Sequence, residues 1–331
     1  MRQTIRPVIA MAIGLTAMTA WAAQELPFQT TMTEAERARE EQQRARQEAM
    51  PDTPGTGRFP AIKEEIRTPV PQVLYRPANL AALGNTKLGI YVFGNGACVD
   101  DGASSRLHLL EVASHGYLAI APGRILNGPG ATGARPPPAA TQAPELNVRS
   151  SYKDMLQAID WATAQNADPK SPYYGRIDTR AVAASGFSCG GAQAMRVAAD
   201  PRVKTLVMMN SGLFADGASS SIPEMDVRKS ALRDVRGPVL YVIGGETDTA
   251  FGNAKDDFSR ISHVPVVLAN LLGVGHGGTY WQPNGGKAAT TVVAWLDWQL
   301  RGDARAARNF TGKDCGLCRD KAWTIEKKRL D

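Results

Sequence analysis

From residue 59 onward, short apolar runs alternate with segments whose apolar residues recur at helical spacing. Continuous apolar runs indicate strands buried on both faces, and a spacing of about three to four residues indicates amphipathic helices. The pattern predicts strands at 73–75, 88–93, 117–121, 180–185, 203–209, 238–243 and 264–268. It predicts helices at 103–114, 148–164 and 287–300, with a further helix that ends at 199.

Strands that alternate with helices predict an α/β fold whose mostly parallel central sheet carries helices on both faces. No internal repeat interrupts the pattern, so we expect one domain over residues 59–331. Residues 122–146, in contrast, are rich in Pro, Gly and Ala and show little helix or strand signal. Loops of that length are often lids or rims of binding sites, and a floppy insertion is the alternative.

The N-terminal segment has the pattern of an export signal. Arg2 and Arg6 precede an apolar stretch, and Ala-Trp-Ala at 20–22 offers a cleavage site. The apolar stretch is short for a membrane span, which makes a membrane anchor the weaker alternative. We therefore expect a signal peptide over residues 1–23, a periplasmic or secreted protein, and no stable membrane insertion.

Residues 24–58 are rich in Glu, Arg, Gln and Ala and carry few large apolar side chains. We expect a flexible or helical arm here, poorly packed, that ends in a linker rich in Pro and Gly. Over the whole chain, hydrophobic residues make up 43% and charged residues 21%, which is ordinary for a globular protein with a substantial core. The net charge of +6 is not gathered in a basic block, so nothing favours nucleic-acid binding.

The strand predicted at 180–185 leads directly into Gly-Phe-Ser-Cys-Gly at 186–190, which fits the Gly-x-Ser-x-Gly nucleophile elbow. A serine on a sharp strand-to-helix turn has a strained backbone, and the flanking glycines relieve crowding there. The turn presents the hydroxyl above the sheet and places the next backbone N–H where it can stabilise an oxyanion. Because the motif lies between a strand and a helix, we predict that Ser188 is a nucleophile rather than an incidental serine in a tight turn.

A nucleophilic serine needs a base. In folds that place the serine on such a strand-to-helix elbow, the catalytic residues follow one another along the chain in the order serine, acid, histidine. Of the four histidines, His108 and His115 precede the serine, and His263 stands at the entrance to a predicted strand. His276 lies in a glycine-rich loop after the last predicted strand, and it is the expected base.

The acid should lie on a loop that follows a strand between the serine and the histidine. Asp248 is the expected acid, because it lies just after the strand predicted at 238–243. Glu246 is the nearest alternative, whereas Asp256 and Asp257 look like the exposed start of a helix. The predicted triad needs no metal and no organic cofactor.

An even number of cysteines in an exported chain is compatible with disulfides, and this chain has four. Cys315 and Cys318 form a Cys-x-x-Cys pair, which is also found in redox motifs and zinc sites. Only one such pair exists, no histidine lies near it, and it sits at the C-terminal end. We therefore expect a local structural disulfide between Cys315 and Cys318.

With these motifs, the sequence resembles the α/β-hydrolase superfamily, and within it the branch of bacterial cutinase-like polyester hydrolases and dienelactone-hydrolase-related proteins. The resemblance covers roughly residues 70–300. It is carried by Ala-Ser-His-Gly-Tyr at 113–117, by the elbow at 186–191, and by Ile-Gly-Gly-Glu-Thr-Asp-Thr at 243–249. The resemblance implies an α/β-hydrolase fold and the hydrolysis of a small-molecule or polymeric carboxylic ester.

The resemblance also implies site residues. The family's triad falls on Ser188, Asp248 and His276, the same residues that the motifs select. Its oxyanion hole falls on the backbone N–H groups of Cys98 and Cys189. The polyester hydrolases carry larger side chains at these two positions, one of them aromatic, so an aromatic clamp on a polymer is in doubt here.

Two N–H groups that point at one oxygen atom must lie close together, so Cys98 and Cys189 could form a disulfide that locks the two donors in place. The alternative is a pair of free thiols lining the pocket. For the function, a peptidase or amidase with the same triad is one alternative. A non-catalytic binding protein on the same fold is another.

Overall fold

The computed structural model describes residues 42, 45–132, 150–218, 220 and 222–330, and the described chain from Ala45 onward forms one compact unit. The expected signal peptide and the first part of the arm lie outside the described residues, as do residues 133–146 of the predicted long loop and the three residues after it. Within the described ranges, no helix is both long enough and apolar enough to cross a membrane.

Nine strands of the described chain form one sheet in the order β1-β2-β4-β3-β5-β6-β7-β8-β9. The pairs β1–β2, β2–β4 and β8–β9 are antiparallel, and the other neighbouring pairs are parallel. The strands are β1 (Ala61–Ile66), β2 (Gln72–Pro77), β3 (Leu88–Gly94), β4 (Tyr117–Pro122), β5 (Ile177–Phe187), β6 (Val203–Met209), β7 (Val239–Ile243), β8 (Val266–Leu271) and β9 (Trp323–Lys328).

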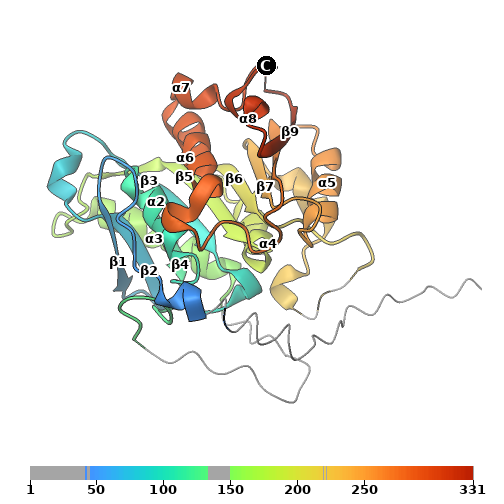
Figure 1. Cartoon of the computed structure of the whole chain (residues 1–331). Coiled ribbons are helices and arrows are strands. Elements are labelled where there is room, and N and C mark those ends of the chain that lie inside the picture. Colours follow the sequence, from blue (N-terminus) through green and yellow to red (C-terminus); the bar gives the residue numbers. More distant parts are fainter. Residues whose placement is uncertain (1–41, 43–44, 133–149, 219, 221, 331) are drawn as a thin grey trace, which may run out of the picture. The chain divides into compact units, whose positions relative to one another are not determined.

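Helices flank the sheet, as Figure 1 shows. The longer ones are α2 (Arg106–Ser114), α3 (Tyr152–Ala167), α4 (Cys189–Val197), α5 (Phe251–Arg260) and α6 (Gly286–Arg301). Short helical turns complete the fold: η1 (Leu80–Leu83), η2 (Gly96–Cys98), η3 (Pro223–Met225), η4 (Lys229–Asp234), η5 (Pro283–Gly285), α7 (Ala304–Ala307) and α8 (Gly316–Arg319).

Two apolar cores lie on the two faces of the sheet. Leu109 of α2 and Trp295 of α6 are buried in one core. Met155 of α3, Met195 of α4 and Phe258 of α5 are buried in the other. Apolar residues on α6 recur at helical spacing, so one stripe of that helix is buried against the sheet. The prediction of an α/β fold with a mostly parallel, helix-flanked sheet is confirmed.

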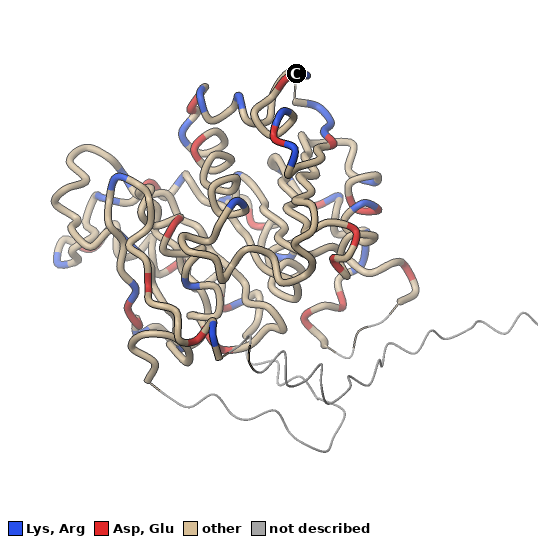
Figure 2. Tube along the Cα trace, viewed as in Figure 1, with Lys and Arg blue, Asp and Glu red and all other residues tan. Residues whose placement is uncertain are grey.

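The seven predicted strands correspond to β2 through β8, whereas β1 and β9 were not predicted. Both are edge strands in which three consecutive charged residues interrupt or follow the apolar ones, Ala-Ile-Lys-Glu-Glu-Ile and Trp-Thr-Ile-Glu-Lys-Lys. Such strands bury only part of one face and therefore lack a continuous apolar run. Figure 2 shows Lys and Arg residues mixed with Asp and Glu along the described chain, as expected for a charge that is spread over the surface.

The end of the arm differs from the expected linker. The Arg106 side chain of α2 donates to Asp52 Oδ1 at 3.0 Å, and the backbone N–H of Thr56 donates to Glu111 Oε2 at 2.7 Å. Gly55 approaches α2 so closely that a Cβ atom there would lie 2.3 Å from Ser114 Oγ. The expectation of a poorly packed arm is therefore corrected for these residues, because hydrogen bonds hold them against α2.

Candidate active site

Ser188 lies between the end of β5 and the start of α4, with φ 52° and ψ −118°. Such a conformation is rarely adopted by residues other than glycine and is found where the surrounding structure enforces it. Here the Ser188 N–H donates to Met209 O at 3.1 Å, and its carbonyl accepts from Ser211 Oγ at 2.7 Å. These two bonds to the end of β6 and the residues after it hold the turn that presents the hydroxyl.

The glycines of the motif permit a close approach between β3, β5 and α4. A Cβ atom at Gly190 would lie 2.0 Å from Gly94 O, and a Cβ atom at Gly186 would lie 2.1 Å from Gly190 O. Any side chain at these positions would push α4 away from the ends of the two strands. The glycine spacing predicted from the motif thus has a direct steric cause.

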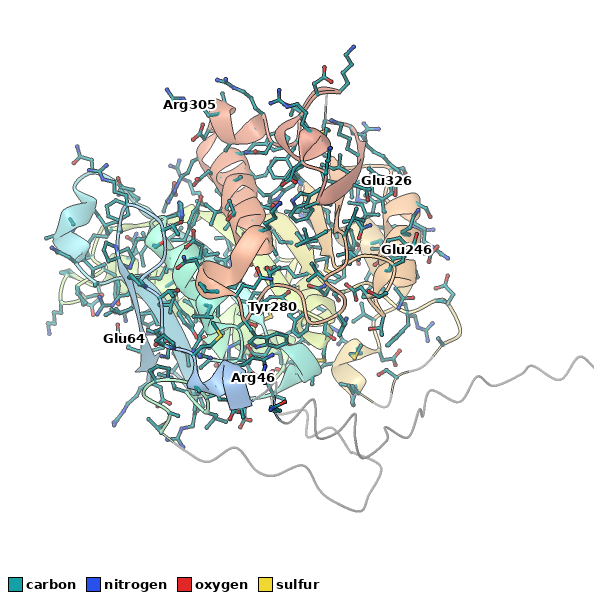
Figure 3. All side chains as sticks on the ribbon, viewed as in Figure 1. Arg46, Glu64, Glu246, Tyr280, Arg305 and Glu326 are labelled. Carbon is teal, nitrogen blue, oxygen red and sulfur yellow. A yellow bond between two sulfur atoms is a disulfide. The ribbon has the colours of Figure 1, made fainter. Side chains whose placement is uncertain are left out.

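The structure brings together the three residues predicted as a triad. His276 Nε2 lies 3.0 Å from Ser188 Oγ, and His276 Nδ1 lies 2.8 Å from Asp248 Oδ1. Because an ionised carboxylate only accepts, the proton of the neutral imidazole is on Nδ1 and the lone pair of Nε2 faces the serine hydroxyl. Glu246, the alternative acid, is exposed on the loop after β7, where Figure 3 labels it.

Asp248 is buried, and four hydrogen bonds satisfy its carboxylate. Oδ1 accepts from His276 and from the Ala250 N–H at 2.9 Å. Oδ2 accepts from the Gly244 N–H at 3.0 Å and from Asn210 Nδ2 at 2.7 Å. Burial acts to raise the pKa of Asp248, but these bonds, that of His276 foremost, hold the pKa below its ordinary value. The carboxylate is therefore ionised at neutral pH and able to stabilise an imidazolium.

A buried disulfide joins Cys98, the last residue of η2, to Cys189, the first residue of α4, with the Cα atoms 5.4 Å apart. The disulfide suggested from the resemblance is confirmed, and so is that between Cys315 and Cys318. The Ile222 side chain packs against the disulfide between Cys98 and Cys189.

The two backbone N–H groups predicted as oxyanion donors differ in whether they already donate a hydrogen bond. The Cys189 N–H is at the start of α4, and no described group accepts a hydrogen bond from it. The Cys98 N–H donates to Asn95 O at 3.1 Å within η2. The Cys189 N–H is thus available to an oxyanion. The Cys98 N–H could donate to an oxyanion only by sharing or giving up its hydrogen bond to Asn95 O.

Aromatic side chains border the imidazole on one side. The Phe187 ring lies 5.3 Å from the His276 ring and 4.5 Å from the Tyr280 ring, measured between centroids. Trp281 packs edge-on against Tyr280 at 6.2 Å. Figure 3 shows Tyr280 on the segment that leads into α6. The three rings thus form an aromatic surface beside the imidazole.

The three other histidines have structural partners. His108 is buried, and its Nε2 lies 3.0 Å from the Tyr91 hydroxyl. His115 contacts Glu111 at 3.1 Å. His263 Nε2 lies 2.8 Å from a backbone carbonyl oxygen. Across the described ranges, no group of three or more His, Cys, Asp or Glu residues could hold a metal ion.

The expectation that Asp256 and Asp257 form the exposed start of a helix is wrong. Both residues lie in the second half of α5, where Asp256 is half-buried and Asp257 is fully buried. Asp257 Oδ1 is 2.6 Å from Lys229 Nζ, and Asp257 Oδ2 accepts from the Leu213 N–H at 2.8 Å. This ion pair fastens the segment that follows β6 to α5, a role that its position in the sequence did not reveal.

A scan against models of known protein families finds no match, and a search of the curated proteins finds none either. The assignment of a function therefore rests on the geometry of the site.

Proposed function

We propose that this protein is a serine hydrolase with an α/β-hydrolase fold that cleaves carboxylic esters through an acyl-enzyme intermediate. The observation that carries the proposal is the hydrogen-bonded chain from Ser188 through His276 to Asp248, built on a strained turn between a strand and a helix. This combination supplies a nucleophile, a base and an orienting acid in hydrogen-bond reach of one another.

The strand order supports the proposal. From β3 the chain crosses to β4 on one side and then to β5 on the other side of β3. In α/β sheets, ligands bind at such a switch point, beyond the carboxyl ends of the strands. The loops after β3 and β5 carry Cys98 and Ser188, so the proposed reaction centre lies where the topology favours a site.

In the proposed reaction, Ser188 Oγ attacks the ester carbonyl carbon while His276 Nε2 takes the hydroxyl proton. The negative charge on the carbonyl oxygen is stabilised by the Cys189 N–H, with Cys98 as the second donor. His276 then gives the proton to the departing alcohol. Water, activated by the same imidazole, releases the acid and restores the serine. Asp248 keeps the imidazole oriented and stabilises its charged form.

The proposed location is the periplasm or the extracellular space. Both disulfides favour an oxidising compartment, because cytosolic thiols are normally kept reduced. The basic and apolar N-terminal sequence with its cleavage site supports the same location.

The test is to treat purified protein with a fluorophosphonate probe and with a panel of p-nitrophenyl esters and aminoacyl anilides. We expect labelling and ester turnover by the wild type, and neither by a folded Ser188→Ala variant. Turnover of the anilides in preference to the esters would indicate a peptidase or amidase instead. A wild-type protein that does not label would point to a binding protein on the same fold.

A further inference from the structure

Asn210 is a buried residue next to the proposed triad that no motif singles out. It directly follows β6, is 2% exposed, and has a φ of 45°. Its Nδ2 donates to Asp248 Oδ2 at 2.7 Å and to Gly275 O at 3.2 Å. Its Oδ1 accepts from the Tyr280 hydroxyl at 3.3 Å. All the polar atoms of this side chain are therefore engaged with residues around the site.

The partners fix the orientation of the amide. The carboxylate of Asp248 and the carbonyl of Gly275 only accept, so the NH₂ group must face them. The Tyr280 hydroxyl then has an acceptor in Oδ1. A flipped amide would set an oxygen against two acceptors, so only one orientation satisfies the network.

These contacts link the acid to the base. Asn210 holds Oδ2 of Asp248, which leaves Oδ1 directed at the imidazole. The second hydrogen of the same NH₂ group is bonded to Gly275, the residue immediately before His276. One amide thus constrains both the carboxylate plane and the loop that carries the histidine.

We infer that Asn210 is a positioning residue for the reaction, a neutral clamp that sets the distance and angle between Asp248 and His276. The inference rests on the proposed function. Asparagine suits the place for two reasons. It tolerates a positive φ better than most residues, and it donates to a carboxylate without adding a charge.

Two substitutions distinguish the role of the Asn210 amide from that of the backbone conformation at this position. Asn210→Gly keeps the backbone conformation without strain and removes the amide. Asn210→Asp keeps the shape but sets a second carboxylate against Asp248, and two such groups cannot both ionise freely. Because small misplacements of catalytic groups cost about 10²-fold in rate, we expect kcat to fall by about 10²-fold in both variants, with KM changed by less than about threefold.

The measurements are kcat and KM for a p-nitrophenyl ester, the rate of fluorophosphonate labelling, and thermal unfolding. The matched control is Asn127→Asp, since the buried Asn127 also donates to an aspartate, with Nδ2 2.6 Å from Asp101 Oδ2. The control should leave kcat and the labelling rate within about twofold of the wild type.

Wild-type kcat and labelling rates in a folded Asn210→Gly variant would overturn the inference while leaving the proposed function intact. The inference would also be overturned if Asn127→Asp lowered kcat as much as Asn210→Asp does. The loss of kcat would then reflect a general loss of stability rather than the positioning of Asp248 and His276. A wild-type protein without turnover or labelling would overturn the proposed function, and the inference with it.

Discussion

The Cα atoms of Cys98 and Cys189 lie 5.4 Å apart, and their disulfide ties the loop after β3 to the residue that follows the proposed nucleophile. The two cysteines are 91 residues apart in the sequence. The bond therefore closes a long loop of the unfolded chain and at the same time fixes the two backbone donors of the proposed oxyanion hole.

The first prediction concerns this bond. A Cys98→Ala/Cys189→Ala variant should lose about 2–5 kcal/mol of unfolding free energy, because a long loop of the unfolded chain is no longer closed. Ester turnover should also fall, since the donors are no longer held together. Urea unfolding measures the loss of unfolding free energy, and kcat for an ester measures the loss of turnover.

The control for the disulfide is Cys315→Ala/Cys318→Ala, whose bond spans a sequence separation of 3. Closing so short a segment removes little chain entropy, so its loss should cost less stability. It should leave kcat unchanged. Equal effects of the two double variants on kcat would contradict a special role for Cys98 and Cys189.

The second prediction concerns pH. Burial lowers the pKa of His108 to about 3, against an ordinary value of 6.5. The unfolded chain therefore binds the proton first as the solution is acidified. The stability that neutral His108 contributes is complete above pH 6.5 and is lost as the pH falls from there toward 3.

A His108→Gln variant should remove this dependence, because glutamine can still donate to the Tyr91 hydroxyl but does not titrate. We expect the unfolding free energy of the variant to fall by several kcal/mol less than that of the wild type between neutral pH and pH 4. Unfolding by urea at a series of pH values measures the unfolding free energy of both proteins. Equal dependence of this free energy on pH in the wild type and the variant would refute the prediction.

The third prediction concerns the glycines at the elbow. Gly190→Ala would set a Cβ atom 2.0 Å from Gly94 O, a backbone atom that cannot move without shifting β3. Overpacking of this kind costs about 1–3 kcal/mol or more, and the displaced α4 should abolish turnover. Thermal unfolding and ester hydrolysis are the measurements.

Gly252→Ala is the matched control, since a Cβ atom at Gly252 in α5 would meet nothing within 4 Å. Alanine is the better helix former, so this variant should gain about 0.5–1 kcal/mol and keep full activity. If both alanine variants behaved alike, the steric explanation of the motif would fail.

The sequence predicts the parts of the site that have a local signal. Ser188 is marked by glycines between a strand and a helix, and His276 and Asp248 follow from chain order and from the strands before them. The central strands are equally visible, because both of their faces are buried and their apolar runs are continuous.

Asn210 and Tyr280 have no such signal. An asparagine after a strand has the same pattern as an ordinary turn residue, and only the folded sheet brings it to Asp248. A tyrosine before a helix gives no sign that its hydroxyl will meet an amide 70 residues away in the chain. Both depend on contacts between distant segments, which a local pattern cannot contain.

The antiparallel strand β9 covers the edge of the sheet beside β8. All six residues of β8, Val-Val-Leu-Ala-Asn-Leu, are buried. Without β9, this apolar strand would present unpaired backbone groups, the arrangement by which sheets of different molecules join into aggregates. With β9 in place, the outer edge of the sheet carries Lys327 and Lys328, and charged side chains on an edge strand disfavour pairing with the sheet of another molecule.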